Sequence, residues 1–261
     1  MASSKVEITP TELISTIQRS KLPTVLVEGP DDAVVFRKLE EYHSNIDLSI
    51  LQCGGRSALL KVFDRRNEVA NVQLAFIADQ DSWVAHGIPQ KYQIPDVIFT
   101  LGYSIENDLF LDGDIFGMID PINRPDFLIE MEKISNWFAL MLQRIATGGA
   151  PTIDLNVARL LDDPAYVTTV MTLAPGEIYP TQLEQDLVRN YQTLLRGKLL
   201  LQLAIRHLTV KHHAVGLMDM IAHMEGPRLK RILNAVANLF SPPPAIPLSN
   251  PTSVNFNSNS I

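Results

Sequence analysis

Acidic residues recur at the ends of apolar runs in the first part of this 261-residue chain. Glu28 ends the run TVLVE, and Asp32 stands four residues later. Asp79 and Asp81 close the run VQLAFIADQD, and Glu106 follows DVIFTLGYSI. Clustered carboxylates repel one another unless a cation neutralises them, and oxygen ligands alone favour magnesium, manganese or calcium. Because two such ions can activate water and stabilise the leaving oxygen of a phosphodiester, these residues predict metal-dependent phosphodiester hydrolysis.

The elements that must position these carboxylates are predicted to be parallel strands. The runs 24–29, 46–53, 72–79 and 96–105 are short and apolar, and segments with helical spacing separate them. This alternation predicts a parallel sheet that is covered by helices on both faces. The ligand site of such a sheet lies outside the carboxyl ends of its strands. We therefore expect the carboxylates to converge at one edge of the sheet.

The rest of the chain is predicted to be helical. Apolar residues recur at helical spacing in 126–146, 181–213 and 227–240, and strand patterns are lacking after residue 107. The expected fold is α/β, with a parallel sheet flanked by helices and then a C-terminal helical subdomain. An N-terminal extension or helix, the sheet domain, the helical subdomain and a disordered tail are expected over residues 1–22, 23–109, 110–240 and 241–261, respectively.

Charge and composition restrict the classes of function. The chain has 22 Lys and Arg against 29 Asp and Glu, a net charge of −7, which argues against broad adhesion to nucleic acid. Residues 186–231 nevertheless hold eight basic residues against three acidic ones, which fits a phosphate-facing half or a solvated helix face. The single cysteine, Cys53, excludes an internal disulfide framework. Because no apolar run could span a membrane and no secretory signal is evident, a cytoplasmic protein without a membrane partner is expected.

Two motifs carry a family resemblance. VEGPDD at 27–32, followed by IADQD at 77–81, resembles the Toprim domain that topoisomerases, bacterial primases and OLD-type nucleases share. Gly54-Gly55 is similar to the glycine turn after the second strand of that domain. YSIEN at 103–107 and the later Gly197-Lys198 are similar to a branch of stand-alone Toprim proteins close to the OLD nucleases. Some members of this branch are toxic effectors paired with an ABC-type ATPase in anti-phage defence.

The resemblance implies a role for each acidic residue. Glu28 would be a metal ligand or a general acid/base, and Asp79 and Asp81 would hold the main metal. Asp32 matches the second acidic residue of OLD-type nucleases, and Glu106 would complete a second metal site. The implied cofactor is Mg²⁺ or Mn²⁺.

Lys198 has two interpretations. By the resemblance, it would steady the scissile phosphate or the transition-state charge. It also lies in LLRGKLLLQL, an apolar helical segment broken by Gly197, where a lysine at the helix rim can extend its charge into solvent. Other residues near the strand ends are interpreted as structural, with helix caps or loop residues at Asp31, Asp108 and Asp112 and a packing residue at Cys53.

The function implied is a metal-dependent nuclease that cleaves DNA or an RNA such as tRNA. The resemblance also implies a homodimer, and a toxic effector of anti-phage defence that a partner ABC-type ATPase controls. Topoisomerase and primase activities would need further domains that the sequence does not show. A non-catalytic metal-binding Toprim module in a partner complex is the alternative. A small-molecule phosphotransfer enzyme is disfavoured, because haloacid-dehalogenase phosphatases carry Asp-x-Asp on the first strand with a Thr two residues later, whereas Ser82-Trp83 follows Asp81 here.

Overall fold

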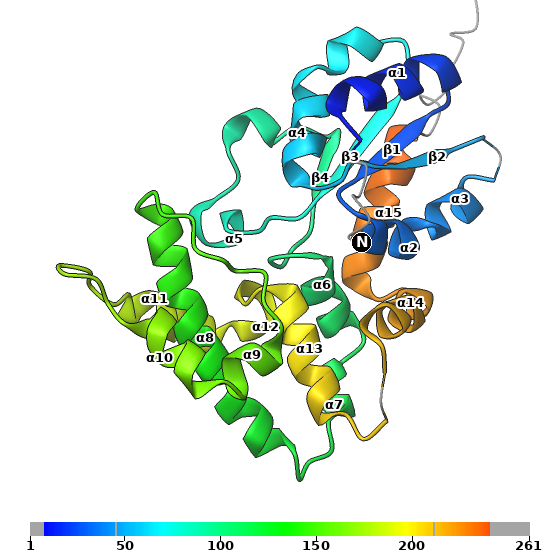
Figure 1. The fold of residues 1–261 in the computed structure, drawn as a ribbon. Coiled ribbons are helices and arrows are strands. Elements are labelled where there is room, and N and C mark those ends of the chain that lie inside the picture. Colours follow the sequence, from blue (N-terminus) through cyan, green and yellow to red (C-terminus); the bar gives the residue numbers. More distant parts are fainter. Residues whose placement is uncertain (1–7, 45, 211, 241–261) are drawn as a thin grey trace, which may run out of the picture.

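The computed structural model describes residues 8–44, 46–210 and 212–240. Its centre is one parallel sheet in the order β2-β1-β3-β4 (Figure 1). The strands are β1 (Thr24–Val27), β2 (Ser49–Gln52), β3 (Leu74–Ala78) and β4 (Val97–Phe99). The predicted α/β fold is confirmed, since a helix-flanked parallel sheet is followed by an all-helical region. The tail predicted to be disordered, 241–261, lies outside the described residues.

Helices cover both faces of the sheet, because alternate strand residues point to opposite sides. Leu26 and Phe76 belong to one core cluster, with the apolar faces of α1 (Pro10–Ser20) and α4 (Arg56–Asp64). Val25 and Ile77 face the other way, where α2 and α15 contact the sheet and α14 packs on α2 (Figure 1). The helices on this second side are α2 (Pro30–Phe36), α3 (Lys38–Tyr42), α14 (Ala214–Met224) and α15 (Pro227–Phe240).

The all-helical region is built around the long helix α8 (Arg124–Ala146). Both α11 (Thr181–Arg189) and α13 (Gly197–His207) pack against α8, and α13 also contacts α6 (Ile105–Asp112). Figure 1 shows α6 between this group and the sheet. The shorter elements are η1 (Arg66–Val69), α5 (Trp83–His86), η2 (Gln90–Tyr92), α7 (Ile115–Met118), α9 (Val157–Leu161), α10 (Pro164–Met171) and α12 (Tyr191–Leu194). None of the described helices is long and apolar enough to cross a lipid bilayer.

The strand predicted over 96–105 is too long, because only β4 within it is extended in the sheet. The carboxylate of Asp108 accepts hydrogen bonds from the N–H groups of Leu101 and Gly102, at 2.8 and 3.0 Å. These bonds turn the chain after β4, and a capping box between Ser104 and Asn107 starts α6 at Ile105. The second half of the apolar run is therefore a turn and a helix.

The helical pattern predicted over 181–213 is also interrupted. α12 ends at Leu194, and Leu195 is extended before α13 begins. The side chain of Asn107 donates hydrogen bonds to the carbonyls of Gln192 and Leu195, at 2.9 and 3.0 Å. This side chain from α6 satisfies carbonyl groups that the helix break leaves open. The chain is helical on both sides of the break, so apolar spacing alone could not reveal it. The predicted helical segment also extends too far, because α13 ends at His207 and the described residues from 208 to 213 are not helical.

One hydrophobic core joins the sheet to the helical region. It includes Val25 of β1, Phe138 of α8, Leu200 of α13 and Val236 of α15, all of which are buried. The last helix, α15, therefore returns across the molecule to pack against β3 and β4. The helices that follow the sheet in the sequence thus complete its cover in space.

Candidate metal centre

A pocket of about 620 Å³ opens at the carboxyl ends of β1 and β3. All five carboxylates predicted to converge line this pocket, as does Lys198. The five are Glu28, Asp32, Asp79, Asp81 and Glu106. Their convergence at one edge of the sheet is confirmed, whereas their role as metal ligands stays a prediction. The topology explains it, because neighbouring parallel strands end side by side.

Glu28 and Asp79 tie the ends of two strands and the start of a helix together. The carboxylate of Glu28, just after β1, accepts a hydrogen bond of 2.9 Å from the Asp79 N–H. The carboxylate of Asp79, just after β3, accepts one of 2.9 Å from the N–H of Ile105, the first residue of α6. A helix N-terminus favours a nearby negative charge. Each carboxylate therefore also fixes the backbone that carries the next one.

Asp32 and Glu106 reach the pocket from the first turns of two helices. The carboxylate of Asp32 accepts a hydrogen bond of 2.7 Å from the Gly29 N–H, which fixes the start of α2. Glu106 is 5% exposed and accepts a hydrogen bond of 2.5 Å from the Ser104 hydroxyl. A carboxylate that is buried to this extent needs an ion-pair or hydrogen-bond partner when it is charged. The ammonium of Lys198 lines the same pocket; burial lowers its pKa, but the charges of Glu106 and Asp31 outweigh burial and raise it.

Asp81 is held in an unusual backbone conformation. Its φ of 48° lies in the left-handed region, which is uncommon for a residue with a side chain. The Asp81 N–H donates to the Tyr103 carbonyl at 2.7 Å, and its carboxylate accepts from Arg56 at 2.9 Å. Arg56 also donates to the Gln80 carbonyl at 2.9 Å. These contacts offset the local strain and fix the direction of the Asp81 side chain.

Two cations line the pocket opposite the strand ends. Arg196 donates to the Ile153 carbonyl at 2.9 Å and to Asp154 at 3.0 Å, and Lys198 lies 3.5 Å from Asp31. Sequence reasoning missed Arg196 and also Arg56, which pairs with Asp81. Only weak sequence signals pointed to these two arginines. Arg196 stands two residues before Lys198. Arg56 follows the glycine turn directly.

Gly197 explains how α13 brings these cations so close. A Cβ placed on Gly197 would overlap the hydroxyl of Ser104 and crowd Asn107 and Glu106. Only a residue without a side chain lets the first turn of α13 rest directly on the first turn of α6. The glycine that interrupts the apolar helical pattern is therefore a contact between two helices of the site.

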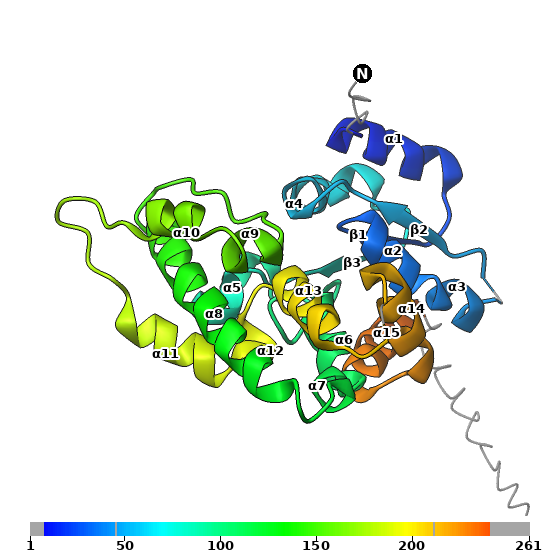
Figure 2. The ribbon, with the colours of Figure 1, turned by 60° about the horizontal axis from the view of Figure 1, so that its bottom comes forward.

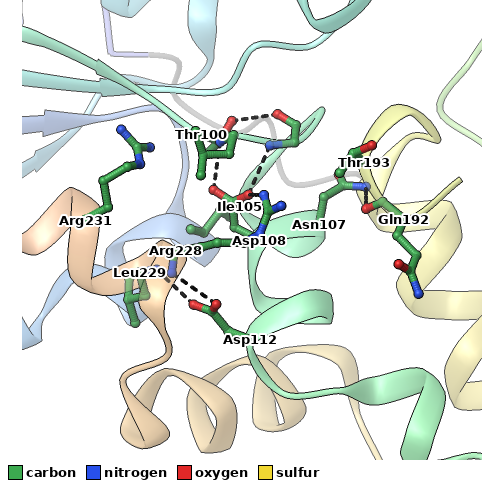
Figure 3. A network of polar contacts seen from close by, with 12 residues as sticks. Thr100, Ile105, Asn107, Asp108, Asp112, Gln192, Thr193, Arg228, Leu229 and Arg231 are labelled. Carbon is green, nitrogen blue, oxygen red and sulfur yellow. Dashed lines mark hydrogen bonds and ion pairs between the residues drawn. The ribbon is translucent and has the colours of Figure 1, made fainter. Parts of the chain in front are cut away.

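A buried polar network positions the turn that carries Tyr103 and Ser104 (Figure 3). Asp108 is fully buried and pairs with Arg228 of α15 at 2.9 Å, in addition to binding two N–H groups of the turn. Asp112 accepts from the N–H groups of Arg228 and Leu229 and so caps α15. Both aspartates act as the structural residues that we expected. They fasten the last helix to the edge of the sheet that holds the carboxylates.

Burial and mutual repulsion disfavour the charged forms of the carboxylates. Burial is the larger cause, followed by the charge of Asp81, and together they raise the pKa of Glu28 to about 8. Burial and then Glu106 raise the pKa of Asp32 to about 7. Burial, and then Glu28, raise the pKa of Asp79 well above its usual value. A carboxyl cluster of this kind attracts a cation that can replace its protons.

The acidic side chains of the pocket fit a hard divalent cation, because all of them are carboxylates, which bind metals through oxygen. Among residues 8–44, 46–210 and 212–240, no three His, Cys, Asp or Glu side chains are already arranged to hold a metal ion. Each carboxylate is instead engaged in a hydrogen bond to backbone, hydroxyl or guanidinium. Ligation by these residues would therefore exchange some of those bonds for metal contacts.

Cys53 takes no part in this chemistry. It is fully buried, and burial followed by the charge of Glu28 raises the pKa of its thiol to about 12. A thiol with so high a pKa is not a nucleophile at neutral pH. The interpretation of Cys53 as a packing residue is confirmed.

No protein-family model matches the chain, and no curated protein matches it. The chemistry of the site is therefore inferred from its own residues.

Proposed function

We propose that this protein is a metal-dependent nuclease that hydrolyses phosphodiesters of DNA or RNA. The observation that carries the proposal is one pocket in which the five predicted carboxylates and Asp31 face two cations, Arg196 and Lys198. Carboxylates alone would suit metal storage. Cations beside them suit a substrate that is itself an anion, and a phosphodiester has that charge.

The carboxylates would divide between two ions of Mg²⁺ or Mn²⁺. Glu28, Asp79 and Asp81 would hold the first, and Asp32 and Glu106 would contribute to the second. Bound ions of this kind supply an activated water and stabilise the charge of the leaving oxygen. The hydrogen bonds from the Asp79 and Ile105 N–H groups orient two of the carboxylates before any ion binds.

The two cations would make the acidic pocket accessible to an anionic substrate. Burial alone would lower the pKa of Lys198, but the carboxylates of Glu106 and Asp31 outweigh it, so the pKa is raised. Lys198 therefore stays protonated at neutral pH and can contact a phosphate oxygen. Arg196 is held by Asp154 and a backbone carbonyl, which fixes its guanidinium at the rim. Both residues would bind and orient the phosphate.

Control by a partner is part of the proposal. An unregulated cytoplasmic nuclease would damage its own cell, and the resemblance to stand-alone Toprim proteins supports an effector of anti-phage defence. We propose an ABC-type ATPase as the controlling partner and a homodimer as the active form. Both rest on the sequence resemblance.

A non-catalytic metal-binding module is the second candidate. It explains the carboxylates, and the absence of a ready-made cage among the described residues bears equally on both candidates. It gives no role to Arg196 and Lys198 in the pocket. We therefore rank hydrolysis first.

Cleavage assays with Glu28→Gln test the proposal. Glutamine keeps an oxygen that can accept the Asp79 N–H but removes the charge, so the fold is retained while metal binding is lost. Purified protein would be incubated with plasmid DNA and with total RNA, in Mg²⁺, in Mn²⁺ and in chelator. We expect metal-dependent cleavage of at least one pool that Glu28→Gln abolishes.

The control is Glu132→Gln, which changes an exposed glutamate on α8 and should cleave like the wild type. Glu28→Gln that still cleaves would overturn the mechanism. Metal binding by calorimetry without cleavage of either pool, also in the presence of the ATPase, would favour the non-catalytic module.

A further inference from the structure

A second hollow, of about 320 Å³, lies beside the acidic pocket on the surface of α4. We call it the basic groove. It is lined by Arg56, Ser57, Leu60, Lys61, Asp64 and Tyr92. Five of these residues lie on one face of α4, because their spacing follows the helical repeat. The opposite face of α4, with Leu59, Val62 and Phe63, is buried against the sheet.

The groove carries more positive than negative charge. Lys61 is exposed, and it forms no ion pair with any described residue. Lys91 stands at the same place, 4.4 Å above the ring of Tyr92 and 3.3 Å from Asp64. Arg56 supplies a third cation. Asp64 is the only acidic residue among the six that line the groove.

Arg56 joins the basic groove to the acidic pocket. Its neighbour Gly55 lines the pocket, Arg56 itself lines the groove, and its guanidinium donates to Asp81 at 2.9 Å. Lys198 reaches the same pocket from the first turn of α13 in the helical region, and Arg196 reaches it from the residue before that helix. The ribbon shows α4 and α13 as separate helices in both views (Figures 1 and 2). Cations from two different elements thus border the carboxylates.

The aromatic residues near the groove do not offer a free ring for a base. The guanidinium of Arg56 lies 3.9 Å from the centre of the Trp83 ring. Tyr92 stacks on Trp83 with ring centres 5.5 Å apart. Trp83 therefore serves as a rigid support for Arg56 and Tyr92. Contacts made in the groove would be with phosphates, which carry no sequence information.

We infer that the basic groove binds a backbone phosphate beside the reacting one, so that the substrate is an internal phosphodiester of a polynucleotide strand. This inference rests on the proposed nuclease function. A small phosphate ester has one phosphate and needs only the cations inside the pocket. A strand carries phosphates beyond the pocket, and the acidic pocket repels them unless cations outside it compensate. Lys61, exposed and unpaired, is placed to do so.

Binding of labelled single strands tests the inference without cleavage. Fluorescence anisotropy in chelator would compare oligo-dT and oligo-U of about 16 nucleotides. We expect Lys61→Ala to weaken binding by roughly 3- to 10-fold and to reduce the salt slope by about 0.7, the value for one phosphate contact with a single strand. The charge reversal Lys61→Glu should weaken binding further. The strand bound more tightly identifies DNA or RNA as the substrate.

Lys133→Ala is the matched control, because Lys133 is also an exposed helical lysine but lies on α8. Its affinity and salt slope should equal those of the wild type. Equal affinities of wild type and Lys61→Glu, an equal loss in Lys133→Ala, or no binding of either strand would overturn the inference.

The binding assay separates this inference from the proposed function. Strand binding that depends on Lys61, without cleavage in Mg²⁺ or Mn²⁺ even when the ATPase is present, would uphold the groove and remove the nuclease. Cleavage that depends on Glu28, with binding that does not depend on Lys61, would do the reverse.

Discussion

At the scale of single residues, the buried carboxyl groups of the pocket favour the folded state when they are protonated or when a cation is bound to them. Glu28 and Asp32 have pKa values raised to about 8 and about 7, in each case chiefly by burial. A carboxyl whose pKa is raised in the folded state contributes most stability below its unfolded pKa. That contribution is lost as the pH rises through the folded pKa.

We therefore expect the metal-free protein to lose stability between about pH 4.5 and pH 8, the interval set by Glu28. Urea unfolding in chelator at several pH values would measure the loss. Glu28→Gln should flatten the dependence over this interval, and added Mg²⁺ should restore the stability of the wild type at pH 8. A wild-type stability that rises over the interval would contradict the burial of these carboxyls.

Lys198 belongs to the same scale, because its two interpretations differ in one measurable respect. If it contacts the reacting phosphate, Lys198→Ala should lower kcat by about 10²-fold, as the loss of one transition-state contact does. A lysine that only extends from a helix rim would leave kcat unchanged. Single-turnover cleavage by Lys198→Ala would be compared with Lys133→Ala, which changes an exposed lysine on another helix.

At the scale of elements, the site depends on the contact between the first turns of α6 and α13. Gly197→Ala would place a methyl group against Ser104 and Asn107. We expect a destabilisation of about 1–3 kcal/mol, the usual cost of overpacking, together with a loss of activity as α13 moves away. Chemical denaturation and cleavage assays would measure both effects.

Gly216→Ala is the matched control for Gly197→Ala. It also lies in a helix, but a Cβ there would meet no atom within 4 Å. An alanine at this position should be neutral or should stabilise the protein by up to about 1 kcal/mol. If the two substitutions have the same effect, the close contact of α13 with α6 is not what requires Gly197.

At the scale of the whole molecule, the last helix braces the edge of the sheet that carries the site. Arg228 of α15 is the only cation in an ion pair with the buried carboxylate of Asp108 among the described residues. Arg228→Met would leave that carboxylate with hydrogen bonds from two N–H groups alone. We expect a loss of about 1.5–3 kcal/mol in the free energy of unfolding, the range for a hydrogen bond to a charged group.

The control for Arg228→Met is Arg159→Met, because Arg159 forms an exposed ion pair with Asp163 at 3.6 Å. Such pairs contribute about 0–1 kcal/mol. Thermal unfolding should show a clearly lower midpoint for Arg228→Met alone. Similar midpoints for the two variants would mean that α15 does not brace the sheet through Arg228.

The sequence by itself determined the parallel sheet and the convergence of Glu28, Asp79 and Asp81. Short apolar runs separated by helical spacing specify parallel strands, and an acid that follows such a strand must lie at the carboxyl edge. Asp32 and Glu106 followed from the same rule, because each stands in the first turn of the helix after its strand. These are local signals, so they can be identified from the order of the residues without knowledge of how the chain packs.

Only the tertiary structure decided which distant residues complete the site. Arg56 and Arg196 are ordinary basic residues in the sequence, and they matter because the fold brings one to Asp81 and the other to the pocket. The break before α13 is held by Asn107, which is 88 residues away from Leu195 in the chain. Contacts of this kind depend on the packing of elements that are far apart in sequence. No spacing pattern records them, because spacing describes a single helix or strand and not its neighbours.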